Sequence, residues 1–172
     1  MHSVDSLYIL LVEGGHTALN HVFGCLPKID CAEFGEVRFG YHVDDPLVHI
    51  VTNKNEGEMF VYDAEVKASP PVTCAEPLVA EHHTLFKTRD KVRCYQLKLE
   101  PGESCTVSYP FYYLTCVIKP ATIETSIGEG PQTISWTKAL VKGDLEWKTP
   151  TLNITMTNKG DTTFDQYIAE WR

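Results

Sequence analysis

Apolar and polar residues alternate along most of the chain, which is typical of β-strands that bury one face. In the segment CYQLKLEPGES, large apolar residues alternate with Gln96 and Lys98 and stop at a Pro-Gly turn. Later segments rich in β-branched and aromatic residues repeat this pattern between turn residues: 111–118, 121–127, 132–137, 151–158 and 163–171. No window longer than about ten residues carries an apolar stripe at the helical period. Short strands with frequent turns predict an all-β sandwich or barrel.

One phrase occurs twice in the chain. Residues 51–66 read VTNKNEGEMFVYDAEV and residues 156–171 read MTNKGDTTFDQYIAEW, 105 positions later. Both contain Thr-Asn-Lys, an acidic turn and then Tyr-x-Ala-Glu. A period near one hundred residues is too long for a solenoid repeat, so it indicates duplication of a small β-domain. We therefore expect the two segments to have the same place in two copies of one fold.

The repeat extends beyond these two segments. At the same offset Tyr8 falls on Tyr113, and FGEVRF at 34–39 resembles KGDLEW at 142–147 after a three-residue length difference. Each half thus reads as an apolar strand, a hairpin, a Gly-acidic turn, a strand, a polar turn and a closing strand. The sequence predicts two units of the same architecture.

The middle of the chain has a different composition. KASPPVTCAEPLVAEHH contains three prolines and little periodicity. Proline fixes φ and lacks the N–H that a sheet ladder needs, so this stretch is predicted to be an extended connector. We place the connector at 68–80, between an N-terminal unit at 1–67 and a C-terminal unit at 81–172.

The order of these turns resembles the cupin superfamily. LEPGES at 99–104, Gly-Asp before an apolar strand, and TNKGDTTF at 157–164 before a closing strand carry the resemblance. It covers about 83–172 as one nearly complete cupin unit and 1–67 as the later part of another. The resemblance implies a double-stranded β-helix, a jelly roll of two facing antiparallel sheets, in a tandem like that of bicupins. Such closure hides strand edges that would otherwise promote aggregation.

The two halves are unequal. A strand-rich segment beginning at His83 precedes Tyr113, whereas only seven residues precede Tyr8. The N-terminal unit therefore lacks the strands that open a cupin barrel, either because the chain is a fragment or because another strand completes the sheet. The run LYILLV at 7–12 is apolar at successive positions and needs cover on both faces. We expect an unpaired edge at 7–12 that the connector, the second unit or a partner chain covers, with a homodimer preferred.

The resemblance also implies where a metal would bind, because many cupins hold a metal with imidazoles and one carboxylate inside the barrel mouth. Counted from Gly102, the ligand positions of the second unit hold Ser108, Pro110, Leu114 or Thr115, and Ile154. None of these side chains suits a first-row transition metal. The resemblance thus predicts a metal-free second unit.

The first unit keeps one part of the metal motif. HIVTN at His49–Asn53 matches the His-x-x-x-Asn of the second cupin motif, while the first motif is largely missing. A divalent metal held by His49, His2 and Asp5 is one interpretation. The other is that His49 is a hydrogen-bonded polar residue inside the barrel.

Aromatic residues of the second unit suggest a ligand pocket. The predicted pocket residues are Tyr109, Tyr113, Trp136, Trp147 and Asn153. Aromatic side chains commonly line small-molecule sites, although the same residues could be plain core. Two functions follow: a degenerate cupin without a complete metal site that binds a small molecule or acts as a scaffold, and a metal-dependent oxygenase, lyase or isomerase that works through His49. Whether the chain is an enzyme stays open, and no organic cofactor is expected.

Charge and cysteine content narrow the remaining classes. The 172-residue chain has a net charge of −8, which argues against nucleic acid and against an anionic membrane surface as partners. The longest apolar run, 7–12, is too short to span a bilayer, and no basic residue precedes it as in a signal peptide. We expect a cytoplasmic protein. The six cysteines form no Cys-x-x-Cys pair and are predicted to be buried free thiols.

Overall fold

The computed structural model describes residues 5–12, 17–23, 26–32, 36–41, 49–51, 59–66, 76–89, 92–128 and 130–171. The chain divides into two compact units, Met1–Ala68 and Ser69–Arg172. The predicted all-β fold is confirmed, because the described elements are strands apart from a 3₁₀ turn at Gly130–Gln132. None of the described residues belongs to a helix long and apolar enough to cross a membrane.

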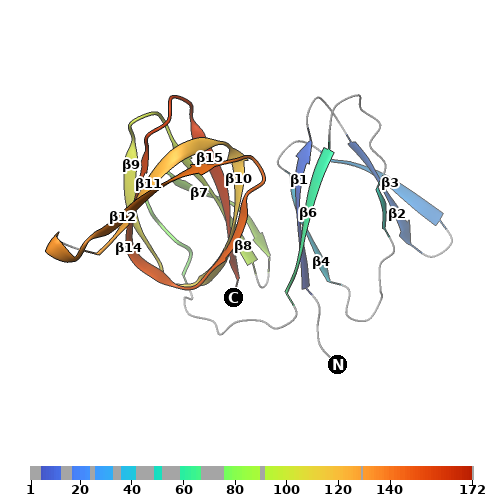
Figure 1. The fold of residues 1–172 in the computed structure, drawn as a ribbon. Helices are drawn as coiled ribbons and strands as arrows, with labels where there is room; N and C mark the ends of the chain where they lie inside the picture. The colour runs from blue at the N-terminus through green and yellow to red at the C-terminus, as the bar shows by residue number, and fades with distance from the viewer. Residues whose placement is uncertain are drawn as a thin grey trace. The chain divides into compact units, whose positions relative to one another are not determined.

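The second unit is a jelly roll of two antiparallel sheets that face each other (Figure 1). One sheet has the order β13-β10-β15-β8-β7, with bounds Leu145–Lys148, Tyr112–Lys119, Phe164–Trp171, Val92–Leu99 and His83–Arg89. The other has the order β12-β11-β14-β9, with bounds Ile134–Leu140, Ala121–Ile127, Thr151–Asn158 and Ser104–Tyr109. The hydrophobic core lies between them and includes Tyr95, Leu97, Leu99, Val107, Phe111, Ile123, Phe164 and Ile168.

Alternating burial explains why these segments form strands around a core. In β9 the exposed Ser104 and Thr106 alternate with the buried Cys105 and Val107, and β8 buries Tyr95, Leu97 and Leu99 as the sequence predicts. The predicted Pro-Gly turn joins these two strands. Gly102 has a φ of 81°, a left-handed conformation that glycine adopts at little cost.

The first unit repeats the later part of the second. Its sheets have the orders β4-β1-β6 and β3-β2-β5. Their bounds are Glu36–Tyr41, Asp5–Val12 and Met59–Val66 for the first sheet, and Leu26–Ala32, Thr17–Phe23 and His49–Val51 for the second. These orders match β13-β10-β15 and β12-β11-β14 strand for strand. β6 and β15 are also 105 positions apart and end the two units, so the predicted duplication is confirmed.

The register of the ladders corrects one detail of the repeat. Tyr8 lies opposite Asp63, and the position of the second unit that lies 105 residues after Asp63 is Ile168. Ile168 lies opposite Thr115, not Tyr113. The counterpart of Tyr8 is therefore Thr115, two positions later than the sequence comparison gave. A shift of two keeps the same strand face, which is why the apolar pattern did not reveal it.

The predicted open edge at 7–12 is wrong. β1 is the middle strand of its sheet, because β4 pairs with it on one side and β6 on the other. Strands later in the chain thus supply both hydrogen-bonded neighbours. In the described part of the chain, β6 pairs with β1 alone, whereas its counterpart β15 pairs with both β10 and β8. The homodimer stays a prediction.

The last part of the predicted connector is ordered against the second unit. Leu78 and Ala80 pack on the barrel core. The backbone N–H of Leu78 donates a hydrogen bond to Tyr95 Oη at 3.0 Å. Residues 68–75 of the connector lie outside the described residues.

Three of the six cysteines can be compared with the prediction. Cys94, Cys105 and Cys116 are buried free thiols, as expected. Burial raises the pKa of Cys105 to about 11 and that of Cys94 and Cys116 to about 12, so none is a reactive thiolate near neutral pH. Cys25 and Cys74 and the side chain of Cys31 lie outside the description.

Candidate functional site

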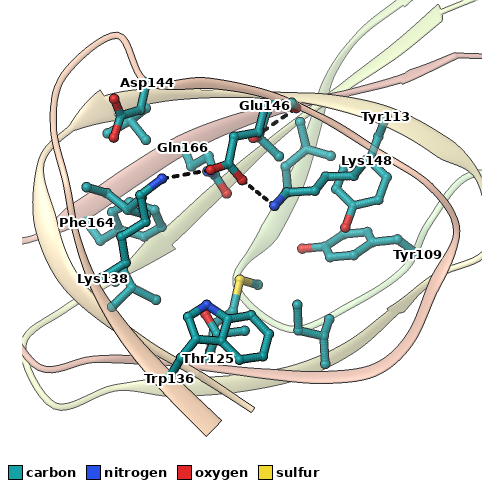
Figure 2. Close-up of a pocket in the computed structure, with 17 residues that line it drawn as sticks. Tyr109, Tyr113, Thr125, Trp136, Lys138, Asp144, Glu146, Lys148, Phe164 and Gln166 are labelled. Carbon is teal, nitrogen blue, oxygen red and sulfur yellow. Dashed lines mark hydrogen bonds and ion pairs between the residues drawn. The ribbon is translucent and has the colours of Figure 1, made fainter. Parts of the chain in front are cut away.

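A cavity of about 180 Å³ lies inside the barrel of the second unit, between its two sheets (Figure 2). Strands of both sheets contribute alternate residues to its wall, because every second side chain of a strand points inward. The lining residues include Tyr109, Tyr113, Thr115, Thr125, Trp136, Lys138, Asp144, Glu146, Lys148, Ile154, Met156, Phe164, Gln166 and Ile168. The interior is therefore apolar and aromatic, with polar groups on one side.

Charged side chains of β12 and β13 form one side of the cavity. Lys138 Nζ lies 2.7 Å from Glu146 Oε1, and Lys148 Nζ forms an ion pair with the other carboxylate oxygen (Figure 2). The hydrogen bond from Lys138, with that from Lys148, lowers the pKa of Glu146, and Glu146 in turn raises the pKa of Lys138. These side chains are 38–50% exposed, so the pairs add little to stability. The two ion pairs hold the ammonium groups of Lys138 and Lys148 at the wall of the cavity.

Two tyrosines line the cavity next to this charged group, and Tyr113 lies directly opposite Lys148 in the β10–β13 ladder. The rings of Tyr109 and Tyr113 lie 4.7 Å apart, and both line the cavity (Figure 2). Burial raises the pKa of Tyr109 well above its usual value and raises that of Tyr113 as well. Both hydroxyls therefore stay protonated at neutral pH and act as hydrogen-bonding groups. Trp136, which is 44% exposed, lies where the cavity meets solvent.

The hydroxyl of Tyr109 is hydrogen-bonded to a histidine. His83 begins β7, at the edge of one sheet, and its Nε2 lies 2.6 Å from Tyr109 Oη on β9, at the edge of the other sheet. Its Nδ1 lies 2.7 Å from the backbone oxygen of Glu81. This contact of His83 was not predicted from the sequence. A contact between residues 26 positions apart leaves no signal in a local pattern.

The half-buried position of His83 predicts a pH dependence of stability. Desolvation lowers its pKa from 6.5, so the folded protein favours the neutral imidazole. Above pH 6.5 both states are neutral and the stabilisation is complete. As pH falls below 6.5, the unfolded chain takes up the proton first, and stability is lost down to the folded-state pKa. We expect urea midpoints of the wild type to fall between pH 7.5 and pH 5 by more than those of His83→Gln, whose side chain does not titrate.

The comparison of the two proteins isolates this group, because other carboxyls titrate alike in both. His82→Gln is the matched control, since it removes the neighbouring imidazole and leaves the Tyr109 contact. Equal pH profiles for wild type and His83→Gln would contradict the assignment.

The predicted pocket residues divide into two groups. Tyr109, Tyr113 and Trp136 line the cavity, whereas Trp147 and Asn153 do not. On β13 the neighbours of Trp147 point inward, so Trp147 faces outward and stacks on Tyr112 at 6.4 Å. Asn153 sits at a register shift of β14 with a φ of 52°, where its N–H donates to Ser108 Oγ on the outer side.

Of the ligand positions predicted from Gly102, Thr115 and Ile154 line the cavity and Ser108 does not. Ser108 faces outward, and its strand neighbours Val107 and Tyr109 are the buried, inward residues. The inward group beside them includes Thr115 and Ile154. None is a histidine or a carboxylate, and no three His, Cys, Asp or Glu side chains of the described residues are grouped to hold a metal. The cavity residues therefore do not fit the metal centre that the family resemblance implies.

The proposed metal residues of the first unit are only partly placed. His49 lies on β5 and Asp5 begins β1, which belong to different sheets. His2 lies outside the described residues. The β2–β5 ladder sets residue His21 directly opposite His49, a pairing that sequence spacing did not suggest. The metal set of the first unit stays a prediction.

Comparison with known proteins identifies the fold. No family model matches the chain, and no curated protein matches its sequence. Oxalate decarboxylase from Bacillus subtilis matches in structure with 12% identity and a TM-score of 0.62, over 98% of this chain and 63% of that one. A cupin domain from Bordetella pertussis Tohama I matches with 18% identity and a TM-score of 0.47, over 52% of this chain and 91% of that one.

The likeness to oxalate decarboxylase concerns the fold alone, because the identity is low. That protein is a bicupin, so the cupin fold predicted from the order of turns is confirmed. This chain spans less than two thirds of its length.

Proposed function

We propose that this chain, which has the cupin fold, is a small-ligand-binding protein whose binding site is the cavity of the second unit and needs no metal there. The observation that supports this most directly is the lining of the cavity. At two positions where the family resemblance predicts metal ligands the interior holds Thr115 and Ile154, and Tyr109 lies beside a third, Ser108. The cavity can therefore hold an organic molecule that contacts these side chains directly.

The size of the cavity limits the ligand. Drug-sized molecules occupy pockets of roughly 300–1,000 Å³, whereas an apolar cavity of roughly 150 Å³ is known to admit benzene. At about 180 Å³ the cavity therefore suits a single ring or a short branched chain. Larger ligands would have to extend past Trp136 into solvent.

The lining also limits the chemistry. Met156, Phe164 and Ile168 favour an apolar body. Gln166 and the two tyrosine hydroxyls can bind a polar substituent. Lys138 and Lys148 are engaged by Glu146, and Asp144 lies beside them, so formal charges on this side cancel. We expect a ligand with an apolar ring or chain and one polar group.

A larger side chain in the cavity should weaken the binding of small ligands. Ile154→Trp places a larger side chain in the lining and is expected to weaken binding of single-ring compounds at least about tenfold. A library of such compounds, carrying phenol, amide or carboxylate groups, is screened by ligand-observed NMR and ranked by calorimetry. Leu152→Trp is the control, since Leu152 lies on the same strand, is 62% exposed and does not line the cavity. Equal affinity in the two variants, or no binding by any compound, would contradict the proposal.

A metal-dependent oxygenase, lyase or isomerase activity in the first unit is the second candidate. It is favoured by the pairing of residue His21 with residue His49, since imidazole is a common ligand of first-row metals. Metal analysis of the purified protein tests it. Stoichiometric Fe, Mn, Ni or Zn that is lost in both His49→Ala and His21→Ala would support this candidate, and a metal retained by both would contradict it.

A further inference from the structure

A chain of hydrogen bonds leads from the cavity to the backbone of Glu81. The carbonyl oxygen of Glu81 can only accept, so His83 Nδ1, at 2.7 Å, carries the proton. In the neutral imidazole Nε2 then has a free lone pair. Tyr109 Oη, at 2.6 Å, must donate its proton to that nitrogen. The geometry thus fixes both the tautomer of His83 and the direction of the tyrosine hydrogen bond.

This direction determines what Tyr109 offers to a ligand. Its only hydroxyl proton is committed to His83, and its side chain lines the cavity (Figure 2). Towards a ligand the Tyr109 oxygen can therefore only accept a hydrogen bond. The preferred ligand group at this end of the cavity is a hydroxyl donor.

We propose that Tyr109 and His83 form a proton relay that takes the proton of a phenol or enol hydroxyl bound in the cavity. The ligand O–H bond breaks as its proton moves to Tyr109 Oη, and the Tyr109 O–H bond breaks as its own proton moves to His83 Nε2. The products are a ligand oxyanion, a neutral tyrosine and an imidazolium. This step rests on the ligand site proposed above.

Every hydrogen bond of the relay survives the transfer. The imidazolium donates through Nδ1 to Glu81 O and through Nε2 to Tyr109 Oη. The new Tyr109 proton is then free to donate to the ligand oxyanion. Since no buried polar group loses its partner, the transfer avoids the cost of an unsatisfied donor or acceptor.

The groups around His83 set the range of suitable ligands. Burial and the neighbouring His82 disfavour the imidazolium. Of the neighbouring strands, β9 brings the Cys105 thiol and β10 brings Tyr113, and both are neutral near pH 7. β13 brings Glu146 and Lys148, the second of which is the ladder partner of Tyr113, and β12 brings Lys138. A ligand hydroxyl must therefore be relatively acidic, which suits an electron-poor phenol or an enol better than an aliphatic alcohol.

The same contact also ties the edges of the two sheets together, so a structural role must be separated from the relay. Tyr109 would be the catalytic residue, because it meets the ligand, and His83 a positioning residue behind it. A bridge that only holds β7 to β9 leaves the ionisation of a bound ligand unchanged. Ionisation is therefore the quantity to measure.

The first test needs no ligand. Long-range proton–nitrogen NMR spectra at pH 7.5 give the tautomer of His83. We expect a proton on Nδ1 and none on Nε2. A proton on Nε2 would overturn the proposal, because Tyr109 would then accept from His83 and could not pass a proton to it.

The second test uses 4-nitrophenol, whose phenolate absorbs visible light. We expect the wild type to shift the ionisation equilibrium of the bound phenol towards phenolate by about tenfold, which is one pKa unit. Tyr109→Phe and His83→Gln should bind the phenol and lose the shift, while His82→Gln should keep it. A shift that survives in His83→Gln would assign it to the lysines and overturn the relay. If 4-nitrophenol does not bind, the ligand site itself is in error, and the NMR tautomer still decides the hydrogen-bond direction.

Discussion

Replacing Glu170 with alanine is expected to lower the free energy of unfolding of the second unit by about 3–5 kcal/mol, as for the loss of one partner of a buried ion pair. The Glu170 side chain is fully buried. Its Oε1 lies 3.4 Å from Arg93 Nη1, and its Oε2 accepts a hydrogen bond from Tyr95 Oη at 2.7 Å. Arg93 is itself only 7% exposed. The variant would leave a buried guanidinium without this carboxylate.

The loss should extend beyond the ion pair. Tyr95 Oη also accepts the backbone N–H of Leu78, so one hydroxyl links the carboxylate to the segment that packs on the core. Removing Glu170 therefore loosens residues 76–80 as well. We expect faster hydrogen exchange of the Leu78 amide in the variant.

Tryptophan fluorescence is a suitable probe for measuring the stability of the second unit. All three tryptophans of the chain, Trp136, Trp147 and Trp171, lie in the second unit, so urea unfolding followed by fluorescence reports on that unit. Glu170→Gln keeps an oxygen for Tyr95 and removes the charge, and should lose less than the alanine variant. Glu124→Ala removes an exposed ion pair with Lys159 and is expected to cost at most about 1 kcal/mol. Equal losses for Glu170→Ala and Glu124→Ala would refute the role assigned to the buried pair.

Much of the fold could be predicted because strand periodicity is a strong constraint. When one face of a strand is buried, alternation fixes which residues point inward, and β8 and β9 follow it. The repeated Thr-Asn-Lys phrase then identified two copies of one unit. The two-residue shift of Tyr8 could not be seen, since it leaves the inward face unchanged.

The site could be predicted only in part, and a shift of one residue explains the main error. Counting from Gly102 placed the first two expected ligands at Ser108 and Pro110, and Ser108 faces outward. The inward positions are Val107 and Tyr109. A turn of uncertain length between a motif glycine and a strand changes every face assignment that follows.

Contacts between the two sheets account for the rest of the missed site. His83 contacts Tyr109 across the edges of the two sheets, and Lys138 on β12 contacts Glu146 on β13 of the other sheet. No local pattern encodes either contact. Trp136 and the two tyrosines could be predicted because they are inward residues of recognisable strands. Placing Trp147 would have required knowing which residues of the short strand β13 point inward.

Asn158 gives the second large effect. It is fully buried at the end of β14, where the turn to β15 begins. Its Nδ2 donates to the backbone oxygens of Leu99 and Thr162 at 2.9 and 2.8 Å. Its Oδ1 accepts the N–H of Gly160 at 2.9 Å. One amide therefore satisfies three backbone groups, two in the turn after β14 and one at the end of β8.

Asn158→Ala is expected to cost about 2–4 kcal/mol, because it leaves buried backbone groups without these partners at about 1–3 kcal/mol each. Asn158→Asp at pH 7 keeps the shape and the acceptor for Gly160 but cannot donate to either carbonyl, so it should be at least as destabilising as alanine. The destabilisation of the Asn158→Asp variant should become smaller as pH falls, because the carboxyl then gains a proton that it can donate. Asn153→Gly, at an exposed position with a φ of 52°, is the control and should stay within about 1 kcal/mol of the wild type. Urea unfolding by tryptophan fluorescence measures all three. An Asn158→Asp variant as stable as the wild type at pH 7 would show that the two donated hydrogen bonds do not hold the turn.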